Sequence, residues 1–430
     1  MRQDLTIAIV GAGSSYTPEL IAGILEHSAE QLPITGLRLA DPNRERLAIM
    51  AGLTQRMLAA GGRRIRVGSD VCLERMLDGA DFVITQIRVG GMAARHLDES
   101  IPARYGLLGQ ETTGPGGLFK ALRSVPAMLD IARAVERVAP QAFILNYTNP
   151  SGIVTEAVLN HSNARIIGLC SGMPAVGAWL REHLREPYPD LRLRAVGLNH
   201  FGFYHRLLSG GREVTGEAIG YLVKQSACAA EGERGDPDWL HLSEMLGAVP
   251  MWGYSEMYFR RARRLRLQAA GEKTRAQEIM AIEQDVFAES ADPNTASKPA
   301  ALSRRGGGGY SQVTFDCMKA ILGDLGTEVV VSARNGSAVE SLPASAAVEV
   351  VCRIGREGAV PLDVGAMPLA FRGLVQAVKA YETLAVEAAV TRSRRATILA
   401  LLNHPLVGDL DVAEPLADEM FRAHGLNFGA

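Results

Sequence analysis

The chain has 430 residues, 47% of them hydrophobic, and a mean hydropathy of +0.05. This length is enough for a large core and for two domains. The net charge of −2 excludes the basic footprint of a nucleic-acid-binding protein, and no run approaches the roughly 18 to 20 consecutive apolar residues of a membrane span. We therefore expect a globular protein whose partners include neither nucleic acid nor membrane.

Apolar strands alternate with helical segments in the first half of the chain. The predicted strands cover residues 5–10, 37–41, 80–87, 142–150 and 164–170. After the first strand, YTPELIAGILEH has apolar residues at helical spacing. This alternation predicts an α/β fold, with a Rossmann-like, doubly wound parallel sheet over residues 1–175. The longer and mixed patterns that follow predict an α+β domain over residues 176–430.

A glycine turn separates the first strand from its helix. Gly11 and Gly13 allow a tight turn and the close approach of a pyrophosphate to the helix N-terminus, although Tyr16 replaces the third glycine of the usual motif. Asp41 ends the second strand, where a carboxylate binds the ribose hydroxyls of NAD and repels the phosphate of NADP. A purely structural turn is the alternative. The expected NAD contacts are Gly11, Gly13, Ser14, Ser15, Asp41, Asn43, Ile87 and Asn146.

The cysteines do not form a disulfide pattern. They are Cys72, Cys170, Cys228, Cys317 and Cys352, an odd number without a C-x-x-C pair. Free thiols of this kind are typical of a reducing compartment, and the polar N-terminus lacks the layout of a signal peptide. We therefore expect a cytoplasmic protein.

A series of sequence blocks stands in a characteristic order. The blocks are VGAGSSYTPEL, QIRVGGMAARHLDESIPARYGLLGQETTGPGG, LNYTNPSGIVTEA, GLCSGMP, GLNHFGF, LSRRGGGGYSQV, NGSAVESLP and NHPLV. Together they resemble the family-4 glycoside hydrolases, which depart from two-carboxylate glycosidase chemistry by using NAD. QIRVGGMAAR and RRGGGGYS are most similar to the 6-phospho-β-glucosidases. The resemblance implies a lactate/malate dehydrogenase-like first domain and a catalytic second domain.

The resemblance assigns a metal to Cys170 and His200. Taken alone, a cysteine that ends an apolar strand is usually core filler, and two such residues about thirty positions apart are a poor metal signature. The resemblance implies that they bind Mn²⁺ or another divalent metal, with open positions left for sugar oxygens.

The reaction implied by the resemblance is an elimination followed by an addition. NAD⁺ takes a hydride from C3 of the sugar, and the resulting ketone acidifies the proton on C2. A base removes that proton while the metal stabilises the enediolate, and the aglycone leaves C1. Water then adds and the hydride returns, so the net reaction is hydrolysis. The family's base is a tyrosine, for which Tyr254 is the first choice and Tyr258 the second.

Further residues are implied as substrate contacts. Arg95 is expected to hold the sugar 6-phosphate, and Asn149 the C2 or C3 hydroxyl. Glu111 is expected near the metal, as a ligand or behind one. Arg305 or Arg304 is expected at the phosphate. Without the resemblance, an isolated arginine or glutamate is normally a solvated surface group.

Ser171 departs from the pattern of the phospho-α-glucosidases. Those enzymes have at this place an Asp that is thought to assist the leaving group, and serine is not an effective acid, which favours a β-linked substrate. Three alternatives stay open: a family-4 glycosidase for another sugar, including an α-linked or unphosphorylated one, a net NAD-dependent 2-hydroxy acid dehydrogenase, and a non-catalytic NAD sensor. The resemblance also implies a homodimer or homotetramer.

Overall fold

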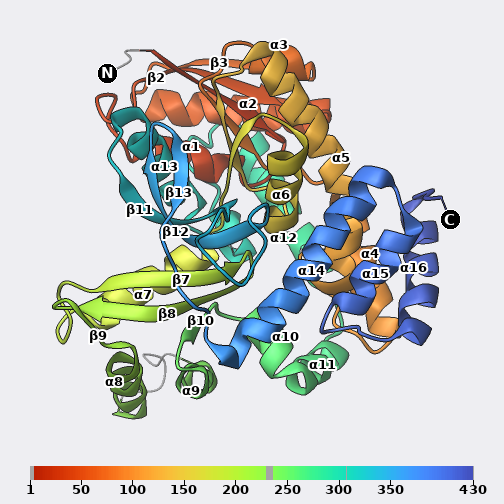
Figure 1. The fold of residues 1–430 in the computed structure, drawn as a ribbon. Coiled ribbons are helices and arrows are strands. Elements are labelled where there is room, and N and C mark those ends of the chain that lie inside the picture. Colours follow the sequence, from red (N-terminus) through yellow and green to blue (C-terminus); the bar gives the residue numbers. More distant parts are fainter. Residues whose placement is uncertain (1–3, 229–235, 307, 430) are drawn as a thin grey trace.

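The computed structural model describes residues 4–228, 236–306 and 308–429. Within these ranges, nine strands form one large sheet in the order β13-β12-β11-β6-β5-β4-β1-β2-β3 (Figure 1). The strands are β1 (Leu5–Val10), β2 (Ile34–Ala40), β3 (Arg66–Asp70), β4 (Phe82–Thr85), β5 (Phe143–Asn146), β6 (Arg165–Gly168), β11 (Thr327–Arg334), β12 (Ala347–Gly355) and β13 (Gly358–Pro361).

Strands β1 to β6 are parallel, as the alternation predicts. All five predicted strands are present. Strands β4, β5 and β6 are shorter than predicted, and β2 begins and ends earlier. The sequence does not predict β3, because RVGSD lies at the sheet edge without a buried apolar run. Near-complete burial of β1 and β4 explains their continuous apolar sequences.

The carboxyl ends of the parallel strands lie side by side at one edge of the sheet. Val10 pairs with Ala40 and with Thr85, while Asn146 pairs with Thr85 and with Gly168. The loops that follow these strands therefore leave the sheet at the same edge, where α/β folds bind their ligands. Their first residues are Gly11, Asp41, Gln86, Tyr147 and Leu169.

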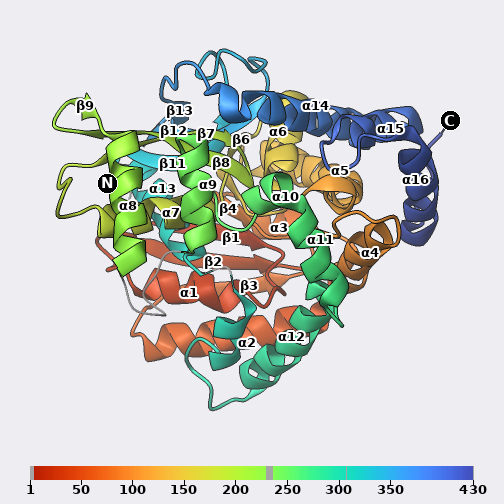
Figure 2. The same ribbon diagram turned by 90° about the horizontal axis from the view of Figure 1, so that it is seen from below.

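Helices cover the large sheet on both faces (Figures 1 and 2). The first twelve are α1 (Thr17–Leu25), α2 (Arg44–Ala60), α3 (Leu73–Leu77), α4 (Gly91–Arg104), α5 (Gly114–Val138), α6 (Ser151–His161), α7 (Gly172–His183), α8 (Thr215–Cys228), α9 (Pro237–Leu246), α10 (Ser255–Phe259), α11 (Arg261–Ala270) and α12 (Arg275–Ala291). The 3₁₀ helix η1 (Ala300–Arg305), α13 (Tyr310–Gly323), α14 (Leu369–Thr391), α15 (Arg394–Asn403) and α16 (Leu410–His424) follow. In the part of the chain that the structure describes, no helix has the length and apolar character that crossing a membrane requires.

The second half of the chain adds strands to the large sheet and also forms a separate sheet. Strand β11 joins β6 in an antiparallel pair, so β11, β12 and β13 extend the sheet begun by the first half. A separate antiparallel sheet contains β7 (Arg192–Leu198), β8 (Phe201–Ser209), β9 (Arg212–Glu213) and β10 (Val249–Pro250), and its strand β7 packs against β12. The domain boundary near residue 175 stays a prediction.

Two groups of later helices pack back onto the first half. Helix α12 contacts α2 and α4, and Figure 2 shows it running below α2. Helix α14 contacts α5 and α6, and α16 contacts α4 (blue in Figure 1). Residues far apart in the sequence therefore come together around the carboxyl edge of the sheet.

Candidate active site

A cavity of about 710 Å³ opens at the carboxyl edge of the parallel strands. Its lining runs from the glycine turn and Asp41 to side chains of α5, η1 and α13. Among the predicted residues, the cavity is lined by Gly11, Gly13, Ser14, Asp41, Asn43, Ile87, Asn149 and Arg305.

The glycine turn leaves no room for side chains. Gly11 has a φ of +87°, and a Cβ there would lie 2.9 Å from the backbone of Gln86. A Cβ on Gly13 would lie 2.8 Å from Asp41 Cγ. The backbone N–H of Gly13 donates to Asp41 Oδ2 over 2.9 Å, and that of Asn43 donates to Oδ1 over 2.9 Å. The turn and the carboxylate therefore form one preorganised unit.

The two serines of the turn face different surroundings. Ser14 lines the cavity, whereas Ser15 is fully buried and its Oγ donates to Glu283 Oε1 on α12 over 2.8 Å. Asn43 begins α2 as its N-cap, since its Oδ1 accepts from the N–H of Arg46. Ser15 is thus engaged beneath the turn and does not line the cavity.

Asn146 makes its hydrogen bonds within the protein. Its carboxamide oxygen accepts from Thr85 Oγ1 and from the N–H of Thr148, each over 2.9 Å, and its side chain is fully buried outside the cavity lining. Its side chain therefore orders the loop after β5 and does not line the cavity, and its place beside the nicotinamide stays a prediction. Ile87 and Asn149 do line the cavity, and Ile87 N–H is fixed by Thr148 Oγ1 at 3.1 Å.

Cys170 and His200 lie just after β6 and between β7 and β8. Burial, reinforced by Glu349, raises the pKa of Cys170 to about 12, and burial lowers the pKa of His200 to about 4. The Cys170 Sγ accepts a hydrogen bond of 3.4 Å from Gly172 N–H, and the His200 imidazole makes no hydrogen bond with any residue that the structure describes. A soft sulfur and an imidazole with unused lone pairs fit a divalent cation.

The donor set at this site is small. In the described ranges, no group of three or more His, Cys, Asp or Glu side chains could hold a metal ion. Two protein ligands would leave positions for substrate oxygens and water, which is the arrangement of a catalytic rather than a structural metal. His200 also has a φ of +68°, an uncommon conformation for a non-glycine residue.

Tyr254 and Tyr258 occupy different places. The Tyr254 ring stacks on His200 with 4.3 Å between ring centroids, and burial raises its pKa to about 12 against the effect of a hydrogen bond with Thr112. Tyr258 packs 4.1 Å from the Phe201 ring and shares a 2.8 Å hydrogen bond with Thr113 Oγ1. Of the two tyrosines, Tyr254 is thus the one beside the pair that fits a metal.

Glu111 is the centre of a buried charge cluster. Its carboxylate contacts Arg88, Arg95 Nη1 at 2.9 Å and Lys120 Nζ at 2.6 Å. Burial opposes ionisation, yet these cations, Arg88 foremost, hold the pKa of Glu111 well below its usual range. Burial, reinforced by Arg88, lowers the pKa of Lys120 to about 7. With Glu99 beside Arg95, the cluster has three basic side chains against two carboxylates, and the lowered pKa of Lys120 reduces the positive excess at neutral pH.

Arg88 and Lys120 line the cavity and are absent from the sequence-based candidates. Arg88 directly follows Ile87 in the loop after β4. Because the loops after the parallel strands leave the sheet at the same edge, this position in the sequence indicates a residue of the cavity. Lys120 lies within α5, where a lysine is ordinarily a solvated residue, so no local pattern indicates its burial.

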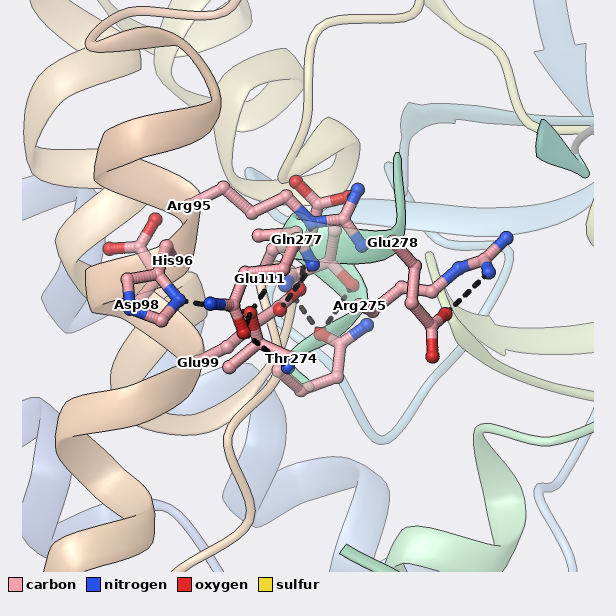
Figure 3. A network of polar contacts seen from close by, with 12 residues as sticks. Arg95, His96, Asp98, Glu99, Glu111, Thr274, Arg275, Gln277 and Glu278 are labelled. Carbon is pink, nitrogen blue, oxygen red and sulfur yellow. Dashed lines mark hydrogen bonds and ion pairs between the residues drawn. The ribbon is translucent and has the colours of Figure 1, made fainter. Parts of the chain in front are cut away.

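Arg95 lies beside this cluster, outside the cavity lining (Figure 3). Its Nε donates to Glu99 Oε1 over 2.7 Å, and Glu99 Oε2 accepts from the N–H of Ala276 at the start of α12. On the same helix, His96 Nδ1 shares a 2.9 Å hydrogen bond with Thr274 Oγ1, the N-cap of α12. Hydrogen bonds from helix α4 therefore link the N-terminus of α12 to the charge cluster around Glu111.

Arg305 and Arg304 differ sharply. Arg304 is exposed and paired with Asp285, whereas Arg305 is 6% exposed, stacks on the Tyr16 ring and reaches Glu283 Oε1 at 3.1 Å. In the described residues, Arg305 Nε and Nη1 have no hydrogen-bond partner although they are buried at the cavity. Such orphaned donors suit an anionic ligand. Gly307, in the glycine run that follows, lies outside the described residues.

Comparisons with known proteins agree with this geometry. The model of the family 4 glycosyl hydrolases matches residues 6–186, and the model of their C-terminal domain matches residues 195–407. A probable 6-phospho-beta-glucosidase of Bacillus subtilis is 38% identical over 99% of this chain and 97% of its own length.

Solved structures extend the comparison to the fold. A 6-phospho-beta glucosidase from Thermotoga maritima, solved with manganese, NAD⁺ and glucose-6-phosphate, is 30% identical, with a TM-score of 0.87 over 99% of this chain and 100% of its own. A lactate dehydrogenase from Eimeria maxima shares the fold at 16% identity and a TM-score of 0.53 over 91% of this chain and 95% of its own, which confirms the predicted fold class. With a matching family model over both halves and a relative 38% identical throughout, this chain belongs to glycosyl hydrolase family 4.

Proposed function

We propose that this chain is a 6-phospho-β-glucosidase that requires NAD⁺ and a divalent cation such as Mn²⁺. The observation that carries the proposal is one cavity lined both by the dinucleotide cradle, with Gly11, Gly13 and Asp41, and by the cationic side chains of Arg88, Lys120 and Arg305. The Bacillus and Thermotoga relatives named above carry the same activity in their names.

The cationic side chains that line the cavity fit a sugar phosphate. A phosphate dianion entering beside Arg88 and Lys120 meets buried donors, and Arg305 Nε and Nη1 offer two more that lack partners in the described residues. Charge-assisted hydrogen bonds of this kind are the strong class. Arg95, paired with Glu99 and Glu111, lies behind the cavity lining and holds the Glu111 carboxylate in place beside Arg88 and Lys120.

Cys170 and His200 would hold the cation, and Gly11, Gly13 and Asp41 would hold NAD⁺. When bound, the cation would polarise the sugar oxygens, and NAD⁺ would serve as the hydride acceptor for C3 and be regenerated within each turnover. Asn149 binds the C2 or C3 hydroxyl and so orients the ring. Tyr254, beside His200, takes the proton from C2, and the electron pair left there expels the aglycone from C1. Addition of water to the resulting double bond gives the net hydrolysis.

The residue after the metal cysteine supports β-linkage. Ser171 begins α7 as its N-cap and offers a hydroxyl, which does not protonate a leaving group effectively. An elimination whose leaving group needs little acid assistance is compatible with this residue. The chain thus lacks at this position the carboxyl that an α-specific enzyme would use.

The setting of the enzyme is part of the proposal. A thiol ligand and the free cysteines Cys72, Cys170, Cys317 and Cys352 suit a reducing cytoplasm, where sugar phosphates are also retained. We propose a homodimer or homotetramer and a division into domains near residue 175. Light scattering on the purified protein measures the assembly directly.

A substrate panel tests the function. A chromogenic 6-phospho-β-glucoside, its α-anomer and the unphosphorylated β-glucoside are assayed with NAD⁺ and Mn²⁺, and again after both are stripped. We expect turnover of the first substrate only, dependent on both additions and without build-up of NADH. Full activity of the stripped protein would contradict the proposal, and stoichiometric NADH with a 2-hydroxy acid would identify a dehydrogenase instead.

A further inference from the structure

A buried carboxyl group lies close to the turn that carries His200. Glu349, on β12, is 1% exposed, and its Oε1 accepts a 3.0 Å hydrogen bond from Asn199 Nδ2. Its Oε2 has no hydrogen-bond partner among the residues that the structure describes. A Cβ added to Gly202 would lie 3.5 Å from Glu349 Oε2, so the carboxyl lies close to the start of β8, two residues after His200.

Asn199 connects this carboxyl to the proposed ligand His200. It precedes His200 in the turn between β7 and β8, where His200 holds its left-handed conformation.

The hydrogen bond to Glu349 sets the orientation of the Asn199 amide. Glu349 Oε1 accepts from the amide nitrogen, which carries the hydrogens that an acceptor oxygen binds. Without Glu349 the amide loses this partner and its orientation is no longer fixed. The strained turn at His200 would also lose a buried anchor.

We propose that Glu349 is a positioning residue of the metal site, acting through Asn199 on the conformation of the turn that carries His200. The inference rests on the proposed function for the presence of the metal. Partners that orient metal ligands from behind are a general feature of metal sites, and their loss typically weakens metal binding by about 10- to 100-fold.

Mn²⁺ affinity tests the inference without relying on turnover. Free Mn²⁺ is titrated by electron paramagnetic resonance against wild type, Glu349→Ala, Asn199→Ala, the double variant and Glu349→Gln, and each melting temperature is recorded. We expect each alanine variant to bind about 10- to 100-fold more weakly and the double variant no more weakly than the single ones. Glu349→Gln, whose side-chain oxygen still accepts from Asn199, is expected within about twofold of wild type.

Ser332→Ala is the matched control. Ser332 is buried opposite Glu349 on β11, and its Oγ has no hydrogen-bond partner in the described part of the chain. Wild-type affinity in folded Glu349→Ala, additive losses in the double variant, or a Glu349→Gln as weak as the alanine variant would each overturn the inference. Should Glu349→Ala not fold, Asn199→Ala and Glu349→Gln decide it. Failure of wild type to bind Mn²⁺ would instead overturn the metal assignment in the proposed function, and this inference with it.

Discussion

The imidazole of His200 lies flat against the phenol ring of Tyr254, with ring centroids 4.3 Å apart and planes 5° from parallel. Tyr258, one helical turn later, points into a different environment formed by Phe201, Thr113 and His404. The stacking places Tyr254 beside the proposed cation site, whereas Tyr258 packs among core residues.

This difference predicts unequal effects of removing each hydroxyl. We expect Tyr254→Phe to lower kcat by about 10²- to 10⁴-fold, because the C2 proton then has no base, with little change in Mn²⁺ affinity. Exchange of the C2 proton with deuterated water, followed by NMR, should stop. Tyr258→Phe is the matched control and should keep both exchange and turnover. The opposite result would make Tyr258 the base.

Metal removal should abolish activity reversibly. A chelator is expected to stop turnover of the 6-phospho-β-glucoside, and added Mn²⁺ to restore it. Cys170→Ser and His200→Ala should lower Mn²⁺ affinity by more than about 100-fold, since each deletes a proposed ligand. Cys317→Ala, which removes a fully buried thiol on α13, is the control. Unchanged affinity in Cys170→Ser would contradict the assignment.

Asp41 should control the choice of dinucleotide. Asp41→Ala removes a charged acceptor at the ribose, so the Kd for NAD⁺ is expected to rise by about 10- to 100-fold and the preference over NADP⁺ to shrink. Fluorescence titration measures both constants. Glu45→Ala removes an exposed carboxylate a short distance along α2 and should change neither.

Arg305 and Arg304 form a natural pair for testing the phosphate site. Arg305→Ala removes buried donors at the cavity and is expected to raise KM for the 6-phospho-β-glucoside by about 10- to 100-fold. Arg304→Ala removes an exposed side chain paired with Asp285 and should leave KM unchanged. The affinity for NAD⁺ is measured in parallel. A loss confined to NAD⁺ would assign Arg305 to the pyrophosphate instead.

His404 should make the fold sensitive to acid. Burial, reinforced by Arg261, lowers its pKa from 6.5 to about 3. Its Nε2 and Nδ1 lie 3.2 Å from the backbone nitrogens of Gly114 and Leu406, and the unprotonated nitrogen of the neutral ring accepts from its neighbour. Between these two pKa values the unfolded chain binds more protons than the folded one, so stability is complete above pH 6.5 and falls as the pH drops towards 3. The loss attributable to this group is about 2 kcal/mol at pH 5.

Urea unfolding over a pH series measures this effect. We expect His404→Gln to be less stable than wild type at pH 8, because a buried ring is lost, and to lose less further stability between pH 6.5 and 5. His241→Gln replaces an exposed histidine and should follow the wild-type curve. Parallel curves for His404→Gln and wild type would refute the assignment.

Local sequence determined the features that depend on a few neighbouring residues. The buried strands are continuous apolar runs because parallel strands are covered on both faces, and Gly11 and Gly13 mark a turn that no side chain fits. The same turn and the ends of the strands indicated Asp41 and Asn149 at the carboxyl edge, because the strands of a parallel sheet all end there. The order of the blocks indicated the family.

Only the tertiary structure decided which side chains share the cavity and which support it. The sequence predicts Asn146 as a cofactor contact, but its side chain makes hydrogen bonds with Thr85 and Thr148. Lys120 is of a residue type that is usually exposed, but it is buried against Glu111. Burial, charge pairing and orientation depend on residues distant in the sequence, such as Glu283 beneath Ser15 and Glu349 beside Asn199. A linear pattern records the spacing along the chain, whereas the electrostatics of a site arise from what the folded chain brings within a few ångströms.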